Sequence, residues 1–150
     1  MKIAVACDHA GFPLKEMVLQ TVRKDGHEAI DLGTDSSDPV DYPDFAEKLA
    51  RFVLSGQAER GILMCGSGVG ASIAANKFKG IYAAICHDTY SAHQGVEHDN
   101  MNVLCIGPRV IGKGLAEDII AAFLHAHFIG NEHGQERHAR RVAKVKLLEN

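Results

Sequence analysis

Short apolar runs alternate with longer stretches of helical spacing along the chain, and this alternation restricts the possible folds more than any other feature. The runs are rich in β-branched and aliphatic residues and cover Ile3–Cys7, Glu28–Asp31, Gly61–Cys65, Ile81–Cys86 and Asn102–Ile106. Strands that alternate with helices form right-handed βαβ units around a parallel sheet that helices cover on both faces. We therefore predict an α/β domain, with Gly61–Cys65 and Asn102–Ile106 as central strands.

Helical spacing is clearest in three segments between and after these runs, namely Phe12–Lys24, Phe45–Leu54 and Leu115–Phe128. A further segment, Glu136–Leu148, has helical character and strong positive charge, which is also typical of a solvated helix face. No internal repeat, low-complexity tract or linker interrupts the pattern. We expect residues 1–150 to form one domain that ends in a basic helix.

The composition limits what kinds of molecule this protein can bind. The 150 residues are 46% hydrophobic and 23% charged, as in ordinary soluble domains, which argues against disorder, collagen or coiled coil. Sixteen basic and nineteen acidic residues give a formal net charge of -3, without the basic footprint of a nucleic-acid binder. No apolar run approaches the roughly 18 residues of a membrane-spanning helix, and Asp8 interrupts the apolar start too soon for a signal peptide. We expect a cytoplasmic protein whose partner is a small molecule, with no role for nucleic acid or membrane.

The chain offers no spacing typical of a metal site. It has four cysteines, Cys7, Cys65, Cys86 and Cys105. They form no CxxC or other short ligand pair, and each lies in or at the end of an apolar run, as small buried hydrophobes do. Four histidines lie near the C-terminus, His125, His127, His133 and His138. Their spacing matches no ligand pattern either, so we expect no metal.

Polar residues gather where the apolar runs end. Open parallel sheets bind ligands beyond the carboxyl ends of their strands, where the strand order reverses. Asp8 and His9 follow the first run, and they reach the end of the third run if these two strands are neighbours. Asp8 could instead cap the next helix. His98 lies just ahead of the fifth run, where a single histidine is more often structural than catalytic.

A glycine-rich loop, Gly66–Gly70, follows the third run and precedes a helical stretch, Ala71–Lys77. Such a loop turns sharply and presents several backbone N–H groups to an anion at a helix start. It could also be a purely structural turn, or a GxGxxA dinucleotide fingerprint with Asp88 as its acidic residue. Against the fingerprint, the loop follows the third strand, and the two remaining strands are too few for a cofactor half and a substrate half.

Several motifs follow one another along nearly the whole chain: Ala6–Phe12 with Leu14 and Lys15, Asp41–Pro43, Cys65–Gly70 running into Ile73–Lys77, His98 with Asn102–Leu104, and Arg137–His138 with Arg141–Val142. Together they resemble the RpiB/LacAB family of sugar-phosphate isomerases. The resemblance implies a Rossmann-like three-layer αβα sandwich with a five-stranded parallel sheet. It also implies a homodimer or dimer of dimers with shared active sites. The implied reaction is the interconversion of ribose 5-phosphate and ribulose 5-phosphate in the pentose phosphate pathway, without metal or cofactor.

The resemblance also implies roles for individual residues. Cys65 matches the base that moves a proton between C1 and C2, with the hydroxyl of Ser67 beside it, and His98 matches the residue that assists ring opening. The cradle of the enediolate matches the amides of Gly66, Ser67, Gly68, Val69 and Gly70. The contacts to sugar and phosphate match Asp8, Tyr42, His9, Arg109, Arg137 and Arg141.

Two positions distinguish this chain within the family. A second subset has a catalytic Glu directly after the last loop glycine, and Ala71 stands there, so the chain resembles the cysteine subset. Where the family usually has Asn after the catalytic histidine, this chain has Asp99, followed by Asn100. Asp99 could accept bonds from substrate hydroxyls, orient His98, or leave the donor position to Asn100. We favour substrate contact, because the loop amides can stabilise the enediolate without a side-chain donor.

The chemistry explains these residue types. A proton on carbon beside a carbonyl is weakly acidic, so its removal needs a base and donors aimed at the developing oxyanion. A thiol acts as a base only as the thiolate, which the positive end of a helix stabilises. Arginine binds a phosphate dianion through its bidentate fork. The alternatives are an isomerase of a four- or six-carbon sugar phosphate and a nucleotide- or flavin-binding module.

Overall fold

Five parallel strands form one sheet, in the order β2-β1-β3-β5-β4, in the computed structural model, which describes residues 1–149. The strands are β1 (Lys2–Cys7), β2 (Glu28–Asp31), β3 (Arg60–Met64), β4 (Ala83–Ile85) and β5 (Val103–Ile106). The strand order reverses between β1 and β3, which are direct neighbours with Cys7 opposite Met64. The predicted parallel sheet is confirmed, and its switch point lies where the first and third strands end.

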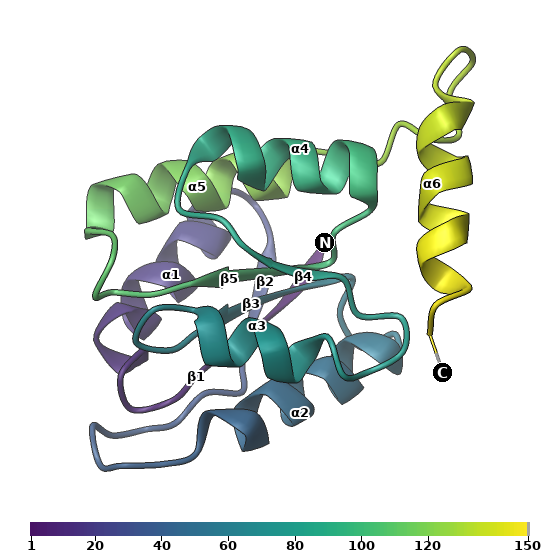
Figure 1. The fold of residues 1–150 in the computed structure, drawn as a ribbon. Helices are drawn as coiled ribbons and strands as arrows, with labels where there is room; N and C mark the ends of the chain where they lie inside the picture. Colours follow the sequence, from purple (N-terminus) through teal and green to yellow (C-terminus); the bar gives the residue numbers. More distant parts are fainter. Residues whose placement is uncertain (150) are drawn as a thin grey trace.

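Helices cover both faces of the sheet (Figure 1). They are α1 (Phe12–Lys24), α2 (Tyr42–Leu54), α3 (Val69–Ala75), α4 (Thr89–Asp99), α5 (Lys113–His125) and α6 (Glu136–Lys146). Successive strand residues point to opposite faces. Ile62 and Met64 therefore pack with α1, α4 and α5, whereas Leu63 packs with α2 and α3. The fold is the αβα sandwich that the resemblance implied.

The helix boundaries differ from the predicted ones in ways that matter for the site. α2 begins at Tyr42, three residues before the predicted start, because Pro43 fits the first turn of a helix. α3 begins at Val69, so the last two residues of the glycine loop are helical. α4 is not evident in the sequence pattern, because only Ala92 and Val96 of this polar helix are buried. His98, which lies just ahead of the fifth run in the sequence, is therefore in the last turn of a helix.

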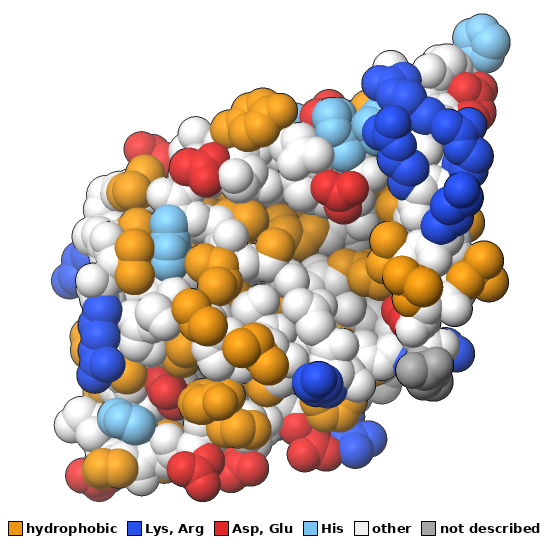
Figure 2. Space-filling model, viewed as in Figure 1, with side chains coloured by type: hydrophobic (Ala, Val, Ile, Leu, Met, Phe, Trp, Pro, Cys, Tyr) orange, Lys and Arg blue, Asp and Glu red, His pale blue; other side chains and the backbone are white. Residues whose placement is uncertain are grey.

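The last helix, α6, stands beside the sandwich and packs against α4 (Figure 1). Only His138 and Val142 of its residues are buried. The side chains of Lys and Arg gather on α6, and a partly apolar hollow separates it from the body of the molecule (Figure 2). Much of α6 is therefore the solvated basic face that its charge indicated. Within residues 1–149, no helix is long and apolar enough to cross a membrane.

Candidate active site

A hollow of about 290 Å³ opens at the carboxyl ends of β1 and β3, the switch point of the sheet. It is lined by Asp8, His9, Ala10, Tyr42, Cys65, Gly66, Ser67, Gly70 and Arg109. The structure thus brings together residues from three separate motifs of the sequence and Arg109, which follows the fifth run. The neighbouring positions of β1 and β3 account for this, because they place the Asp8–His9 turn beside the glycine loop.

Cys65 lines this hollow, follows β3 directly and is 5% exposed. Its Sγ accepts a hydrogen bond from the backbone N–H of Gly68 at 3.2 Å. Gly68 has a φ of 85°, a left-handed conformation that favours glycine and turns the loop back over the sulfur. The thiol therefore contacts an amide of the loop, and the Val69 N–H donates to the Ser67 hydroxyl oxygen at 3.4 Å.

Two side chains flank the glycine loop at close range. The ring of Tyr42 packs so closely on Gly70 that a Cβ there would lie 2.7 Å from a ring carbon. The guanidinium of Arg109 lies over Gly66, and its backbone N–H donates to the Gly66 carbonyl oxygen at 3.1 Å. The absence of side chains at these glycines lets an aromatic ring and a cation approach the loop backbone.

Asp8 and His9 are held by local hydrogen bonds. The Asp8 carboxylate, 5% exposed, accepts the N–H of Gly11 at 2.9 Å. The capping alternative for Asp8 is wrong in detail, because Gly11 occupies the cap position of α1 and the helix has no side-chain cap. The Val40 N–H lies 3.1 Å from Nδ1 of His9, which holds that ring at the edge of the hollow.

The other predicted site residues form a second cluster, where the end of α4 meets α6. The rings of His98 and His138 stack with their centroids 4.1 Å apart and an interplanar angle of 21°. Burial lowers the pKa of His138, and the charges of His98, Arg137 and Arg141 lower it further, against the opposing effect of Asp99. The second cluster therefore combines two imidazoles with the cationic face of α6.

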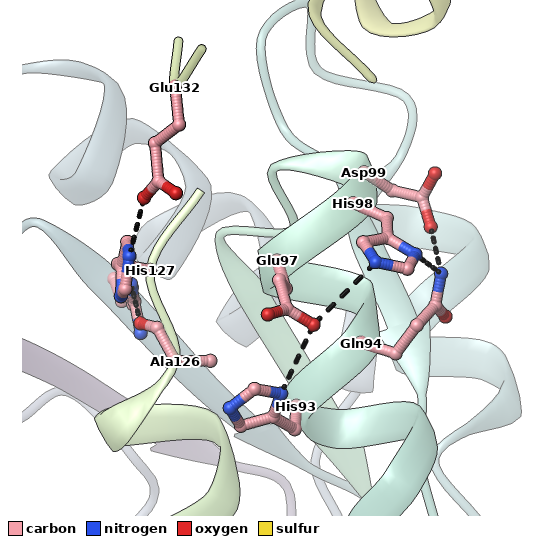
Figure 3. Close-up of polar contacts among 9 residues, drawn as sticks. His93, Gln94, Glu97, His98, Asp99, Ala126, His127 and Glu132 are labelled. Carbon is pink, nitrogen blue, oxygen red and sulfur yellow. Dashed lines mark hydrogen bonds and ion pairs between the residues drawn. The ribbon is translucent and has the colours of Figure 1, made fainter. Parts of the chain in front are cut away.

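Gln94 connects His98 to Asp99 (Figure 3). Its Nε2 lies 3.0 Å from Nδ1 of His98 and 3.3 Å from Oδ2 of Asp99, while Glu97 Oε2 lies 3.6 Å from Nε2 of His98. These contacts favour the orienting role that the sequence left open for Asp99. Asn100 adopts a left-handed conformation with a φ of 55° and ends α4 through its backbone. Asp99 also lines, with Arg141, a groove of about 320 Å³ between the sandwich and α6.

The two clusters lie at opposite edges of the sheet. Cys65 follows the carboxyl end of β3, whereas His98 and Asp99 precede the amino end of the adjacent, parallel β5. The four residues of β5 alone span about 13 Å. One chain therefore does not bring its own His98 to its own Cys65.

The sequence interpretation overlooked two members of the second cluster. His138 was grouped with the other histidines near the C-terminus, and Gln94 was not considered. The usable signal was the spacing of Gln94 and His98, which places them on one helix face once α4 is known. No group of three or more His, Cys, Asp or Glu side chains within residues 1–149 is arranged to hold a metal ion.

The dinucleotide alternative has little structural support. Asp88, its proposed acidic residue, is the N-cap of α4, and its Oδ1 accepts the N–H of Ser91 at 2.6 Å. This carboxylate therefore caps α4. The glycine loop also follows β3 rather than the first strand, as the sequence indicated.

Comparison with known proteins shows the family of this chain. The ribose/galactose isomerase family model matches residues 3–145. Ribose-5-phosphate isomerase B of Escherichia coli (strain K12) is 47% identical over 148 residues, which cover 99% of this chain and 96% of that protein. A D-erythrulose-4-phosphate isomerase of Pectobacterium atrosepticum is 42% identical over 132 residues, which cover 87% of this chain and 86% of that protein.

A solved structure of Clostridium thermocellum ribose-5-phosphate isomerase B superposes with a TM-score of 0.93 and 46% identity, covering 99% of this chain and 97% of the other. The fold, the strand-end hollow and these similarities define an isomerase that acts on sugar phosphates. The chain belongs to the ribose/galactose isomerase family.

Proposed function

We propose that this isomerase interconverts ribose 5-phosphate and ribulose 5-phosphate through an enediolate, with Cys65 as the base. The observation that supports this most is the buried Cys65 thiol beneath the amides of the glycine loop, at the switch point of the sheet. The E. coli relative, nearly half identical over almost the full chain, is named as the B-type ribose-5-phosphate isomerase.

The proposed proton transfer uses only groups of this hollow. The Cys65 thiolate removes the proton from C2 of the open-chain aldose, and the electron pair of that C–H bond forms the C1–C2 double bond of the enediolate. The amides of the loop from Gly66 to Gly70 donate to the oxyanion, as preorganised N–H donors stabilise developing oxyanions in other enzymes. The Cys65 thiol then returns the proton to C1, which gives the ketose. The Ser67 hydroxyl, which also lines the hollow, assists the proton transfers between the oxygens of C1 and C2.

We further propose that a second copy of this chain completes each site. His98 and the Arg137–Arg141 pair lie at the sheet edge opposite their own Cys65, so a site that uses all of them needs two subunits. Exposed apolar side chains support such pairing, namely Val69 and Ile73 on α3, Ile85 at the end of β4 and Tyr90 on α4. In this arrangement Arg109 and His9 bind substrate from one subunit, and Arg137 and Arg141 of the partner subunit bind the phosphate.

Turnover of a panel of phosphorylated aldoses tests the substrate. We expect the highest kcat/KM for ribose 5-phosphate, with ribulose 5-phosphate as product and no added metal or cofactor. Higher turnover of a four-carbon substrate would favour the activity named for the Pectobacterium relative. No turnover of any sugar phosphate, together with flavin or nucleotide in the purified protein, would favour the binding-module alternative.

Mixing two inactive variants tests the shared site. Cys65→Ala and His98→Asn homodimers should each be inactive, yet after subunit exchange a mixed dimer holds one site with both native residues. Random exchange should restore about a quarter of wild-type activity if the assembly is a symmetric dimer with shared sites. Activity that stays at the level of the separate variants, after exchange is verified by mass, would show that each site lies within one subunit.

A further inference from the structure

His87 is a histidine at the sheet edge that holds the candidate hollow, but the proposed chemistry does not use it. It lies between the end of β4 and Asp88, the N-cap of α4, and it is half-buried. Its Nε2 accepts a hydrogen bond from the backbone N–H of Gly107 at 3.1 Å. Because a backbone N–H can only donate, this bond requires a neutral imidazole with its proton on Nδ1.

Gly107 begins the turn after β5, and this turn touches the glycine loop directly. A Cβ at Gly107 would overlap the carbonyl oxygen of Gly66 and the Cα of Ser67, so the two backbones meet without intervening side chains. Two residues further along the turn, the Arg109 N–H donates to the same Gly66 oxygen at 3.1 Å. The turn therefore carries the guanidinium of Arg109 to its place over Gly66.

These contacts form a short chain from His87 through Gly107 to the loop that surrounds Cys65. We propose that neutral His87 is a positioning residue of the isomerase site, which holds the Gly107–Arg109 turn against the glycine loop, and that protonation of His87 releases the turn. The inference rests on the proposed function only for its effect on turnover. The structural part, a hydrogen bond that exists in the neutral form alone, stands without it.

The groups around His87 are consistent with a neutral ring near pH 7. Burial lowers the pKa of His87, and the negative charge of Asp88 opposes this shift. The adjacent Cys86 thiol is protonated and uncharged, because burial raises its pKa to about 11. Arg109, the charged residue of the facing turn, has its guanidinium packed against Gly66. Acidification below the ordinary histidine range therefore breaks the acceptor bond by placing a proton on Nε2.

Two substitutions of His87 separate the effect of its hydrogen-bond acceptor from the effect of its protonation. Gln can present an acceptor oxygen near the position of Nε2 but does not titrate, whereas Phe keeps a ring of similar size and has no acceptor. At pH 7.5 we expect His87→Phe to raise KM for ribose 5-phosphate by about tenfold, the cost of an unmade hydrogen bond that misplaces Arg109. We expect His87→Gln to restore most of this loss. His133→Phe, the same change at a fully exposed histidine, serves as the matched control and should leave KM unchanged.

The pH profile gives a readout that a merely structural role would not alter. The substrate phosphate also titrates in this range, so the test compares the pH profiles of the variants rather than the profile of one protein. We expect the decline of kcat/KM between pH 7 and pH 5 to be shallower in His87→Gln than in wild type, because the Gln acceptor persists in acid. Identical acid limbs in the two proteins, or an unchanged KM in folded His87→Phe, would overturn the proposal.

Amide hydrogen exchange tests the same bond without any activity. The Gly107 amide should exchange at least about tenfold faster in His87→Phe than in wild type, and His87→Gln should restore its protection. Equal exchange at Gly107 in wild type and His87→Phe would refute the structural part. If exchange behaves as expected but no sugar phosphate is turned over, the proposed function fails and the hydrogen-bond link remains.

Discussion

His98 and His138 stack across two helices, with their ring centroids 4.1 Å apart, although forty residues separate them in the sequence. Like charges repel at this distance, so the charge of His98 lowers the pKa of His138. Because α6 supplies His138 and also Arg137 and Arg141, the stack fixes the basic helix against the residue proposed to open the sugar ring.

His98→Asn tests the ring-opening role. We expect a large loss of ribose 5-phosphate turnover, but a much smaller loss in the exchange of the C1 hydrogen of ribulose 5-phosphate with solvent. The ketose has no closed ring to open, because its C5 oxygen is esterified. The two rates can be compared in deuterated buffer by NMR. Equal losses in both would assign His98 to the proton transfer at carbon instead.

The pH dependence of stability follows from the histidines that are neutral in the folded protein. The pKa values of His138 and His87 are lowered from the ordinary 6.5, so the unfolded chain binds protons at a higher pH than the native state does. Their stabilising contribution is complete above pH 6.5 and is lost as the pH falls through the lower native values.

We therefore expect the free energy of unfolding in urea to fall between pH 7 and pH 5 at fixed protein concentration. The decline should be smaller in His138→Phe, which keeps an aromatic stack on His98 and does not titrate. His133→Phe, at a fully exposed position, should retain the wild-type decline. A decline in His138→Phe as steep as in wild type would show that His138 contributes nothing to it.

Arg137 and Arg141 are one helical turn apart on α6, and Arg141, unlike the nearby Arg140, lines the groove between the sandwich and α6. Removal of a charged hydrogen bond costs about 1.5–3 kcal/mol, so Arg137→Ala or Arg141→Ala should raise KM for ribose 5-phosphate roughly ten- to a hundredfold. Arg140→Ala, an equal change of charge, should have little effect. Steady-state kinetics of the three variants distinguishes a phosphate site from a solvated basic face, for which all three would be alike.

Asp99 accepts a bond from Gln94, which also contacts His98, so the carboxylate and the imidazole share one partner. An amide oxygen can accept the same bond, and we expect Asp99→Asn to lower kcat/KM for ribose 5-phosphate by less than about tenfold. Gln94→Leu removes the shared partner and should cost more than Asp99→Asn if this contact orients His98. A loss near a thousandfold in Asp99→Asn would instead mean that the carboxylate takes part in proton transfer.

Most of the fold could be predicted from the sequence because burial on both faces leaves continuous apolar runs, such as the one that ends at Cys65. The meeting of Asp8 with the glycine loop was also predictable, since the ends of neighbouring parallel strands converge. α4 could not be predicted, because it buries only a narrow apolar stripe and is otherwise polar. Because α4 was absent from the predicted elements, the sequence did not place His98 on a helix.

The division of the site into two clusters could in principle have been predicted from the sequence. Residues that follow one parallel strand and residues that precede its neighbour lie at opposite edges of a sheet, which already separates Cys65 from His98. The contact of His138 with His98 could not have been predicted from the sequence, because it depends on where α6 packs after a long connection. Local sequence patterns specify helices and strands, but such a contact is decided by tertiary packing.

The other cysteines provide internal controls for the central claim. Burial raises the pKa of Cys7 and of Cys86 to about 11 and that of Cys105 further, so these thiols are neutral and poor bases at neutral pH. Their replacement by Ala should reduce stability through lost packing and leave the kcat of the folded enzyme near that of wild type.

Isomerisation of ribose 5-phosphate by Cys65→Ala is the most direct test of the account. Loss of a positioned base should lower kcat by about 10²–10⁴-fold, while binding of the substrate, measured as ligand-dependent thermal stabilisation, should persist through the arginines. Cys105→Ala, a buried thiol on the same face of the sheet, is the matched control. A Cys65→Ala protein that retains a tenth or more of wild-type turnover would contradict the assignment of Cys65 as the base.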